Sequence, residues 1–359
     1  MSSLTERQSR RNGFDFLRLA AALAVVVQHS TAHLDADFLW VSPGSRWWFY
    51  DGVPAFFILS GYFVYRSAEV LRRRGDSWSD FFVNRGLRIV PAIWTYLIAT
   101  ALLVVAVGAA APGDLMGAPG LIWIASTLAL VPVLSPGFLD NFGVGVINGS
   151  LWTIPVEVSF YLIVPLLVIG ASRVRGCGRA AGLLVAGVAL GAAALSAVLS
   201  GSLPGKLLDI TFLPHLGFFA LGIWWYRRRD TTPLSGQVAL ATFALYLVIA
   251  LSRPSLPDSA YHPLTLAAAV PLSYTLIYIG SNAPSWMSRL TDRVGDLSFG
   301  AYIWHMPLIN LMLWYGLDDI LPGQVAVALA ILLTLVAAWL SWHLVERRAL
   351  GLKRRSSRA

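Results

Sequence analysis

Eleven apolar stretches of 15 to 22 residues follow one another along this chain and leave little room for another kind of structure. A helix of about 20 apolar residues spans the hydrocarbon core of a bilayer. Only 13% of the 359 residues are charged, against about 25% in soluble domains, so the folded surface must face lipid. The stretches lie at 14–33, 47–66, 88–108, 120–134, 151–170, 180–199, 208–226, 236–252, 262–281, 297–316 and 324–345.

Arginine clusters in the connecting loops predict the orientation of these stretches. By the positive-inside rule the clusters near residues 7–11, 72–85, 173–179, 227–229, 289–293 and 347–358 are cytoplasmic. The loops flanking 120–134 carry only Asp114 and Asp140, so both are expected outside. The prediction is an all-α polytopic protein with about ten transmembrane helices, one short re-entrant or interfacial helix at 120–134, and both termini on the cytoplasmic side of the cell (inner) membrane.

The domain organisation is predicted to be simple. One membrane domain at 13–346 lies between basic cytoplasmic tails at 1–12 and 347–359. The net charge of +8 is explained by the loop arginines, so no nucleic-acid partner is predicted. A single cysteine, Cys177, excludes a disulfide within the chain and a multi-cysteine metal site, and no zinc or phosphate-loop motif appears. No metal is predicted.

Ionisable side chains inside the first stretch are the first candidates for function, because a charge at membrane depth is costly and usually faces an internal cavity. Arg18 and His29 are eleven residues apart, which is three helical turns plus about 20°, so they share one face of a helix. Asp15 lies on the same face, one turn before Arg18. An interfacial Asp15–Arg18 pair with an outward-reaching histidine is the structural alternative.

Two further ionisable residues lie in later stretches. Glu157 follows Trp152, which we interpret as an interface anchor, and needs a histidine or arginine partner or a proton. His305 precedes Pro307, whose missing N–H frees the carbonyl of residue 303 and predicts a local kink. Simple packing pairs remain the alternative at both positions. Gly61, after Leu59-Ser60, is interpreted as a helix-packing position.

A pair of arginines marks the expected start of the third helix. Arg85 and Arg88 are three residues apart and share one face, where two guanidinium groups could bind phosphates through paired hydrogen bonds. Ordinary cytoplasmic anchoring is the alternative.

Taken together, these motifs resemble the acyltransferase-3 family of integral membrane acyltransferases. Five motifs match in order over roughly residues 12–345. They are Asn12 to Ala21 with His29 after Arg18, Phe56 to Tyr62, Arg85-Gly86-Leu87-Arg88, Leu151-Trp152 to Glu157 with Phe160, Tyr161 and Pro165, and Ser298 to His305. Thr153-Ile154-Pro155 replaces the commoner Ser-Leu-x before the glutamate, which we expect to affect the shape of the pocket and not the reaction.

The resemblance implies an O-acyltransferase that moves an acyl group, most simply acetyl, from cytoplasmic acyl-CoA (acetyl-CoA) to a hydroxyl group. The family's essential arginine and histidine correspond to Arg18 and His29, and His29 is the implied general base. Glu157 is expected to orient His29 or stabilise its charged form. His305 is the alternative base.

The resemblance also implies where the two substrates bind. Arg18, Arg85 and Arg88 are expected to receive the phosphates of the acyl donor, with Tyr302 and His305 lining the passage to the outer side. The implied acceptor is a polysaccharide, a lipid-linked sugar or a glycosylated small molecule.

Two other functions fit an apolar chain with buried charges. A proton-coupled transporter or flippase of a small polar or lipid-linked compound would use the same Arg, Glu and His as a proton relay, and inverted repeats, which are not evident here, would favour it. A membrane glycosyltransferase would usually need a clustered acidic metal motif, and only Asp35-Ala36-Asp37 has that form.

Overall fold

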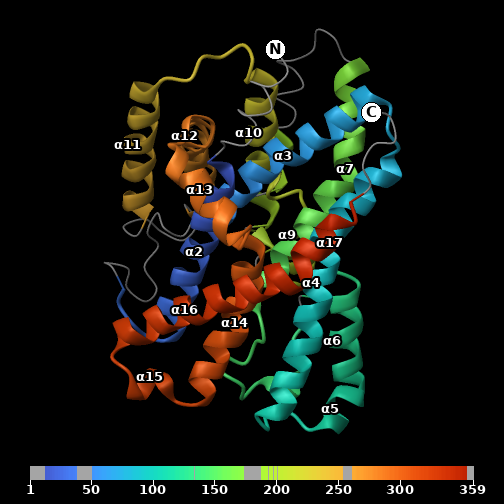
Figure 1. Ribbon diagram of the computed structural model, residues 1–359, viewed down its shortest axis with the longest axis vertical. Helices are drawn as coiled ribbons and strands as arrows, with labels where there is room; N and C mark the ends of the chain where they lie inside the picture. The colour runs from blue at the N-terminus through green and yellow to red at the C-terminus, as the bar shows by residue number, and fades with distance from the viewer. Residues whose placement is uncertain are drawn as a thin grey trace. The chain divides into compact units, whose positions relative to one another are not determined.

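The computed structural model describes residues 13–38, 51–132, 134–173, 187–192, 194–196, 198–199, 201–253 and 261–353. The regular elements of these residues are helices (Figure 1). They are α2 (Phe14–His33), α3 (Gly52–Arg74), α4 (Trp78–Ala106), α5 (Pro112–Met116), α6 (Ala118–Leu128), η2 (Gly137–Leu139), η3 (Gly149–Trp152), α7 (Thr153–Arg173), α9 (Leu203–Asp209), α10 (Leu216–Arg228), α11 (Gly236–Ser252), α12 (Tyr261–Asn282), α13 (Ser285–Val294), α14 (Ser298–Trp314), α15 (Leu317–Ile320), α16 (Gly323–Ser341), the π-helix η6 (Trp342–Glu346) and α17 (Arg347–Gly351).

The predicted stretches and the helices agree best where few charges interrupt them. The first stretch is α2 and the eighth is α11, with the same bounds. The prediction was wrong around the arginine loop at 67–87, because α3 continues to Arg74 and α4 begins at Trp78. Long arginine side chains reach water while their backbone stays helical. Arg85 and Arg88 therefore lie two to three turns inside α4 and not at its start.

Four helices are long and apolar enough to cross a membrane by length and composition: Trp78–Ala106, Gly149–Gly170, Leu264–Asn282 and Gly323–Gly351. Other predicted spans are shorter or more charged. α14 has 17 residues and α10 has 13, while α3 ends in three arginines. The count of about ten crossings stays a prediction.

The stretch predicted at 120–134 forms the 11-residue helix α6 after the short α5. Eleven residues rise about 16 Å, roughly half the thickness of a hydrocarbon core. This length fits a re-entrant or interfacial helix, and its depth in the bilayer stays a prediction. At the other end of the chain, helix continues through α17 to Gly351, beyond the predicted end of the membrane domain.

The described helices fall into two compact units, with boundaries inside α2, α4 and α7. The first unit takes its described residues from 1–21, 46–81 and 156–293. Its closest helix pair is α3 and α10 (Figure 1). A Cβ atom on Gly61 would overlap the backbone of Phe219, and one on Gly222 would overlap the carbonyl of Ile58. The interpretation of Gly61 as a helix-packing position is confirmed, since only glycine allows these backbones to touch.

The second unit takes its described residues from 22–45, 82–155 and 294–359. Its centre is the pair α14 and α16 (Figure 1). Gly300 of α14 lies against Ala338 of α16. A buried apolar cluster joins α14 and α16 to the turn after α2 through Leu34, Ala36, Met306, Ile309, Met312, Ala326, Val327 and Ala330. The C-terminal half of α2 is thereby fixed beside the middle of α14.

Candidate active site

Two histidines from distant parts of the sequence meet in the second unit. His29, one turn before the end of α2, and His305, in the middle of α14, approach with 3.1 Å between His29 Nδ1 and His305 Nε2. His305 is fully buried and His29 is half-buried. His33, one turn after His29, stacks on it with ring centroids 5.9 Å apart. Of His29 and His305, only His29 has a half-buried imidazole that is open to a substrate.

The backbone determines which nitrogen of each ring carries the proton. His305 Nδ1 lies 3.2 Å from the carbonyl oxygen of Ala301, and a carbonyl only accepts hydrogen bonds, so Nδ1 carries the proton. In a neutral ring, His305 Nε2 is then an acceptor, and His29 Nδ1 must donate to it. His29 Nδ1 is also 3.1 Å from the carbonyl of Val25, a second acceptor. With both rings neutral, the lone pair of His29 lies on Nε2.

The turn of α14 that carries His305 is tied to the start of α7. The hydroxyl of Tyr302 donates to the carbonyl of Ser150 at 2.7 Å and accepts from Thr153 Oγ1 at 2.8 Å. Its ring lies 6.0 Å from that of His305. Tyr302 was predicted to line the passage of the acyl donor. Its hydroxyl makes two buried hydrogen bonds inside the protein, which also suits a role in positioning His305, and its place in the passage stays a prediction.

Pro307 leaves the carbonyl of Ile303 without a partner inside the helix, and a side chain from another element bonds to this carbonyl. Asn148 Nδ2 donates to the carbonyl of Ile303 at 2.8 Å, so the predicted free carbonyl is confirmed. About two helical turns further along α14, Asn310 donates to the carbonyls of Val146 and Ile147. The loop before α7 is thus held along α14 by two buried amides.

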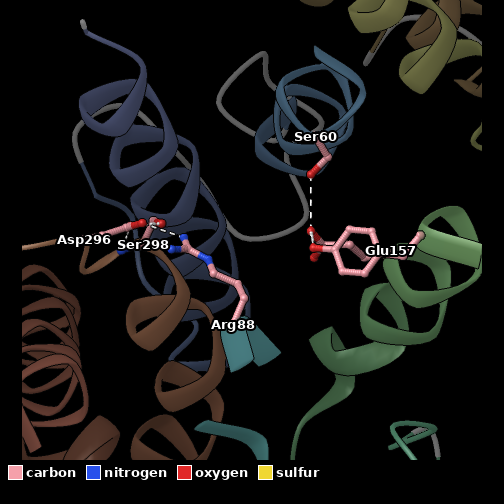
Figure 2. A network of polar contacts seen from close by, with 6 residues as sticks. Ser60, Arg88, Glu157, Asp296 and Ser298 are labelled. Atoms are coloured by element: carbon pink, nitrogen blue, oxygen red, sulfur yellow. Dashed lines mark hydrogen bonds and ion pairs between the residues drawn. The ribbon is translucent and has the colours of Figure 1, made fainter. Parts of the chain in front are cut away.

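Arg88 forms an ion pair in the same unit. Its Nη2 lies 2.5 Å from Asp296 Oδ2, while Asp296 Oδ1 accepts from Ser298 Oγ at 2.6 Å (Figure 2). Asp296 therefore orients the guanidinium of Arg88 and also binds the first turn of α14. Arg85, one turn earlier on α4, is half-buried. The sequence reasoning missed Asp296, although its position two residues before Ser298 at a helix start is typical of a capping carboxylate.

Glu157 belongs to the first unit, one turn inside α7. Its Oε1 accepts hydrogen bonds from the hydroxyls of Tyr161 and Ser60, the latter at 3.4 Å (Figure 2). Tyr161 is one turn further along α7, and Ser60 lies on α3 beside Gly61. The Ser60 hydroxyl is thus a hydrogen-bond donor to this carboxylate. The expected contact between Glu157 and His29 joins residues of different units and stays a prediction.

Arg18 lies in α2, within the first unit and half-buried, three turns before His29 on the same helix. No three His, Cys, Asp or Glu side chains of the described residues gather closely enough to hold a metal ion.

Comparison with known proteins identifies the chain's relatives. Residues 11–343 match the profile of the acyltransferase-3 family, described as an acyltransferase domain. The chain belongs to this family. The resemblance drawn from the five motifs is confirmed, and the protein is a multi-pass membrane acyltransferase.

Several relatives of this acyltransferase are similar over most of its length. It is 29% identical to nodulation protein 10 of Rhizobium leguminosarum bv. viciae, over 96% of this chain and 94% of the relative. It is 24% identical to the peptidoglycan O-acetyltransferase OatA of Listeria monocytogenes, and 25% identical to an O-acetyl transferase of Shigella phage Sf6, each over 95% of this chain. It spans 96% of the phage protein and only 56% of OatA. No solved structure matches the chain. These relatives support membrane O-acetyltransferase activity.

Proposed function

We propose that this acyltransferase moves an acetyl group from cytoplasmic acetyl-CoA to a hydroxyl of a sugar or glycan, with His29 as general base. The observation that carries the proposal is the hydrogen bond between His305 Nε2 and His29 Nδ1. It directs the proton of His29 to Nδ1 and the lone pair to Nε2, on the half-buried ring. His305 has the orienting role that a carboxylate has in a Ser-His-Asp triad.

The reaction needs one proton relay through His29. Nε2 takes the proton of the acceptor hydroxyl as its oxygen attacks the thioester carbonyl carbon. The tetrahedral intermediate then collapses, the C–S bond breaks, and the leaving CoA sulfur takes the proton back from the imidazolium. Glu157 is proposed to stabilise this imidazolium, with Tyr161 and Ser60 holding its carboxylate.

The acyl donor is proposed to bind through arginine. Arg18, Arg85 and Arg88 are the proposed partners of the CoA phosphates, since guanidinium groups form paired hydrogen bonds with phosphate. Asp296 supports this role for Arg88 because it fixes the orientation of the guanidinium before the donor arrives. Both termini are proposed to lie on the cytoplasmic side of the inner membrane. The acetyl group then passes from acetyl-CoA on the cytoplasmic side to an acceptor on the outer side.

The acceptor is proposed from the relatives. OatA is described as acting on peptidoglycan, and a sugar hydroxyl is the nucleophile that this chemistry requires. Polysaccharide, lipid-linked sugar and glycosylated small molecules all supply such a hydroxyl.

The test is release of CoA from acetyl-CoA by the purified protein in nanodiscs, with tetrasaccharide acceptors. His29→Ala is expected to lower the rate by about 10²- to 10⁴-fold, the usual contribution of a general base. His305→Gln is expected to lower kcat with little change in either KM, because it disturbs the tautomer and not binding. The matched control is His343→Ala, a histidine of η6 whose ring lies 4.4 Å from that of Trp339 in a tilted arrangement. Near-normal turnover in His29→Ala would remove it from the mechanism.

The donor side has its own test. Replacing both Arg85 and Arg88 by Ala is expected to raise the KM for acetyl-CoA and to leave the KM for the acceptor unchanged. An unchanged KM for acetyl-CoA would assign these arginines to membrane anchoring. A transporter would move solute without consuming acetyl-CoA, so the wild-type assay also separates the two functions.

A further inference from the structure

We propose that a cavity in the second unit, between α4, α6 and the loop before α7, is the subsite that binds a sugar ring of the acceptor. The inference rests on the proposed function and names the place where its acceptor is recognised. The cavity has a volume of about 80 Å³ and is partly open. A cavity of about 150 Å³ encloses benzene, so this partly open cavity of about half that volume takes one edge of a pyranose ring and leaves the rest of the ring at its mouth.

Aromatic rings form much of the wall. Tyr96 of α4, Trp123 of α6 and Trp152 of η3 line the cavity. Tyr96 and Trp123 are almost fully buried and therefore fixed, whereas Trp152 is half-buried. The face of an aromatic ring is electronegative and attracts the weakly positive C–H groups on one face of a pyranose. Trp152 therefore lines a cavity, and its interpretation as an interface anchor stays a prediction.

Polar groups complete the site. Ser135 Oγ lines the cavity region, is buried, and has no hydrogen-bond partner among the described residues. A buried hydroxyl without a partner is unfavourable, and a ligand hydroxyl would supply the missing bond. Thr127 Oγ1 donates to the carbonyl of Trp123, which leaves its oxygen able to accept. A site with aromatic walls and hydroxyl groups suits a sugar better than a purely apolar acyl chain.

The loop that lines the cavity is hydrogen-bonded to the turn of α14 that carries His305. Asn148, which lines it, donates to the carbonyl of Ile303, and Tyr302 bonds to Ser150 in the adjoining turn. Residues 302–305 of α14 therefore contact the cavity loop through two residues and His29 through a third. A sugar ring bound here contacts a loop that is hydrogen-bonded to the turn that carries His305.

The test first measures binding without any acyl donor. Saturation-transfer NMR is recorded with the full chain in phosphatidylcholine nanodiscs and three probes: chitotetraose, cellotetraose and methyl α-rhamnoside. Transfer to ring C–H protons of at least one probe is expected, with a loss of about threefold or more in Trp152→Leu and Ser135→Ala. The matched controls are Trp339→Leu, exposed on α16, and Ser126→Ala, whose hydroxyl bonds only within α6. Both should retain the wild-type signal.

The second measurement separates this proposal from the proposed function. In the acetyl-CoA assay, both cavity variants should raise the KM for the binding sugar about tenfold and leave the KM for acetyl-CoA unchanged. Sugar binding without any acetyl transfer would refute the transferase function and support the subsite. No saturation transfer from any probe, or cavity variants that change only the KM for acetyl-CoA, would overturn the subsite. The latter outcome would assign the cavity to the acyl donor.

Discussion

Replacing Asn148 by alanine tests whether this amide substitutes for the N–H that Pro307 lacks. The change removes the hydrogen bond to the buried carbonyl of Ile303, which costs about 1–3 kcal/mol for an unpaired group. It also removes the cap at the start of η3, where Asn148 Oδ1 accepts from Ser150 N at 3.1 Å, worth about 0.5–2 kcal/mol. The total loss in free energy of unfolding is about 1.5–5 kcal/mol.

Pro307→Ala separates the two contributions. Alanine restores a backbone N–H at position 307, which can donate to the carbonyl of Ile303 within α14. In the Pro307→Ala background, Asn148→Ala should therefore lose only the cap. The coupling energy of the double-mutant cycle is expected to be about 1–3 kcal/mol, which is the cost of leaving the Ile303 carbonyl without a hydrogen bond.

The assay is reversible unfolding in mixed micelles as the mole fraction of sodium dodecyl sulfate is raised. Wild type, both single variants and the double variant complete the cycle. Ser150→Ala is the matched control, because it loses a hydroxyl bonded to Asn148 but leaves the Ile303 carbonyl paired. Its coupling to Pro307→Ala should be near zero. A coupling of Asn148 and Pro307 below about 0.5 kcal/mol, within ordinary additivity, would refute the reasoning.

Two further perturbations follow from the packing and the charges. Gly222→Ala should destabilise the protein by about 1–3 kcal/mol through overpacking against the Ile58 carbonyl. Gly170→Ala, which meets nothing within 4 Å, should stabilise it by about 0.5–1 kcal/mol; equal effects in thermal unfolding would contradict the helix contact. The stability losses of Asp296→Asn and Arg88→Gln should be coupled, because the two side chains form one ion pair. Additive losses in the same assay would show that the pair is not coupled.

Local sequence patterns predicted the features that neighbouring residues determine by themselves, such as the length of an apolar helix or the effect of a proline. Apolar length predicted α2 and α11 to the residue, because a continuous run of apolar side chains has one solution in lipid. The prediction of a loop at 67–87 was wrong. The number of arginines does not distinguish a loop from a helix whose arginine side chains reach the interface. The free carbonyl at 303 followed from proline chemistry, but its partner Asn148, 155 residues away, did not.

The sequence alone determined the class of protein and the candidates for its chemistry. Scarcity of charge requires a membrane fold, and each ionisable residue in an apolar stretch is conspicuous because its burial is costly. Spacing placed Arg18 and His29 on one helix face, and the motifs indicated the family.

Only the tertiary structure decided which side chains meet. His29 and His305 are 276 residues apart, and nothing local to either predicts that one orients the other. Hydrogen-bond partners depend on distances of a few tenths of an ångström between helices, which are set by the packing of many side chains at once. The same holds for the cavity lined by Tyr96, Trp123 and Trp152, which come from three separate helical elements.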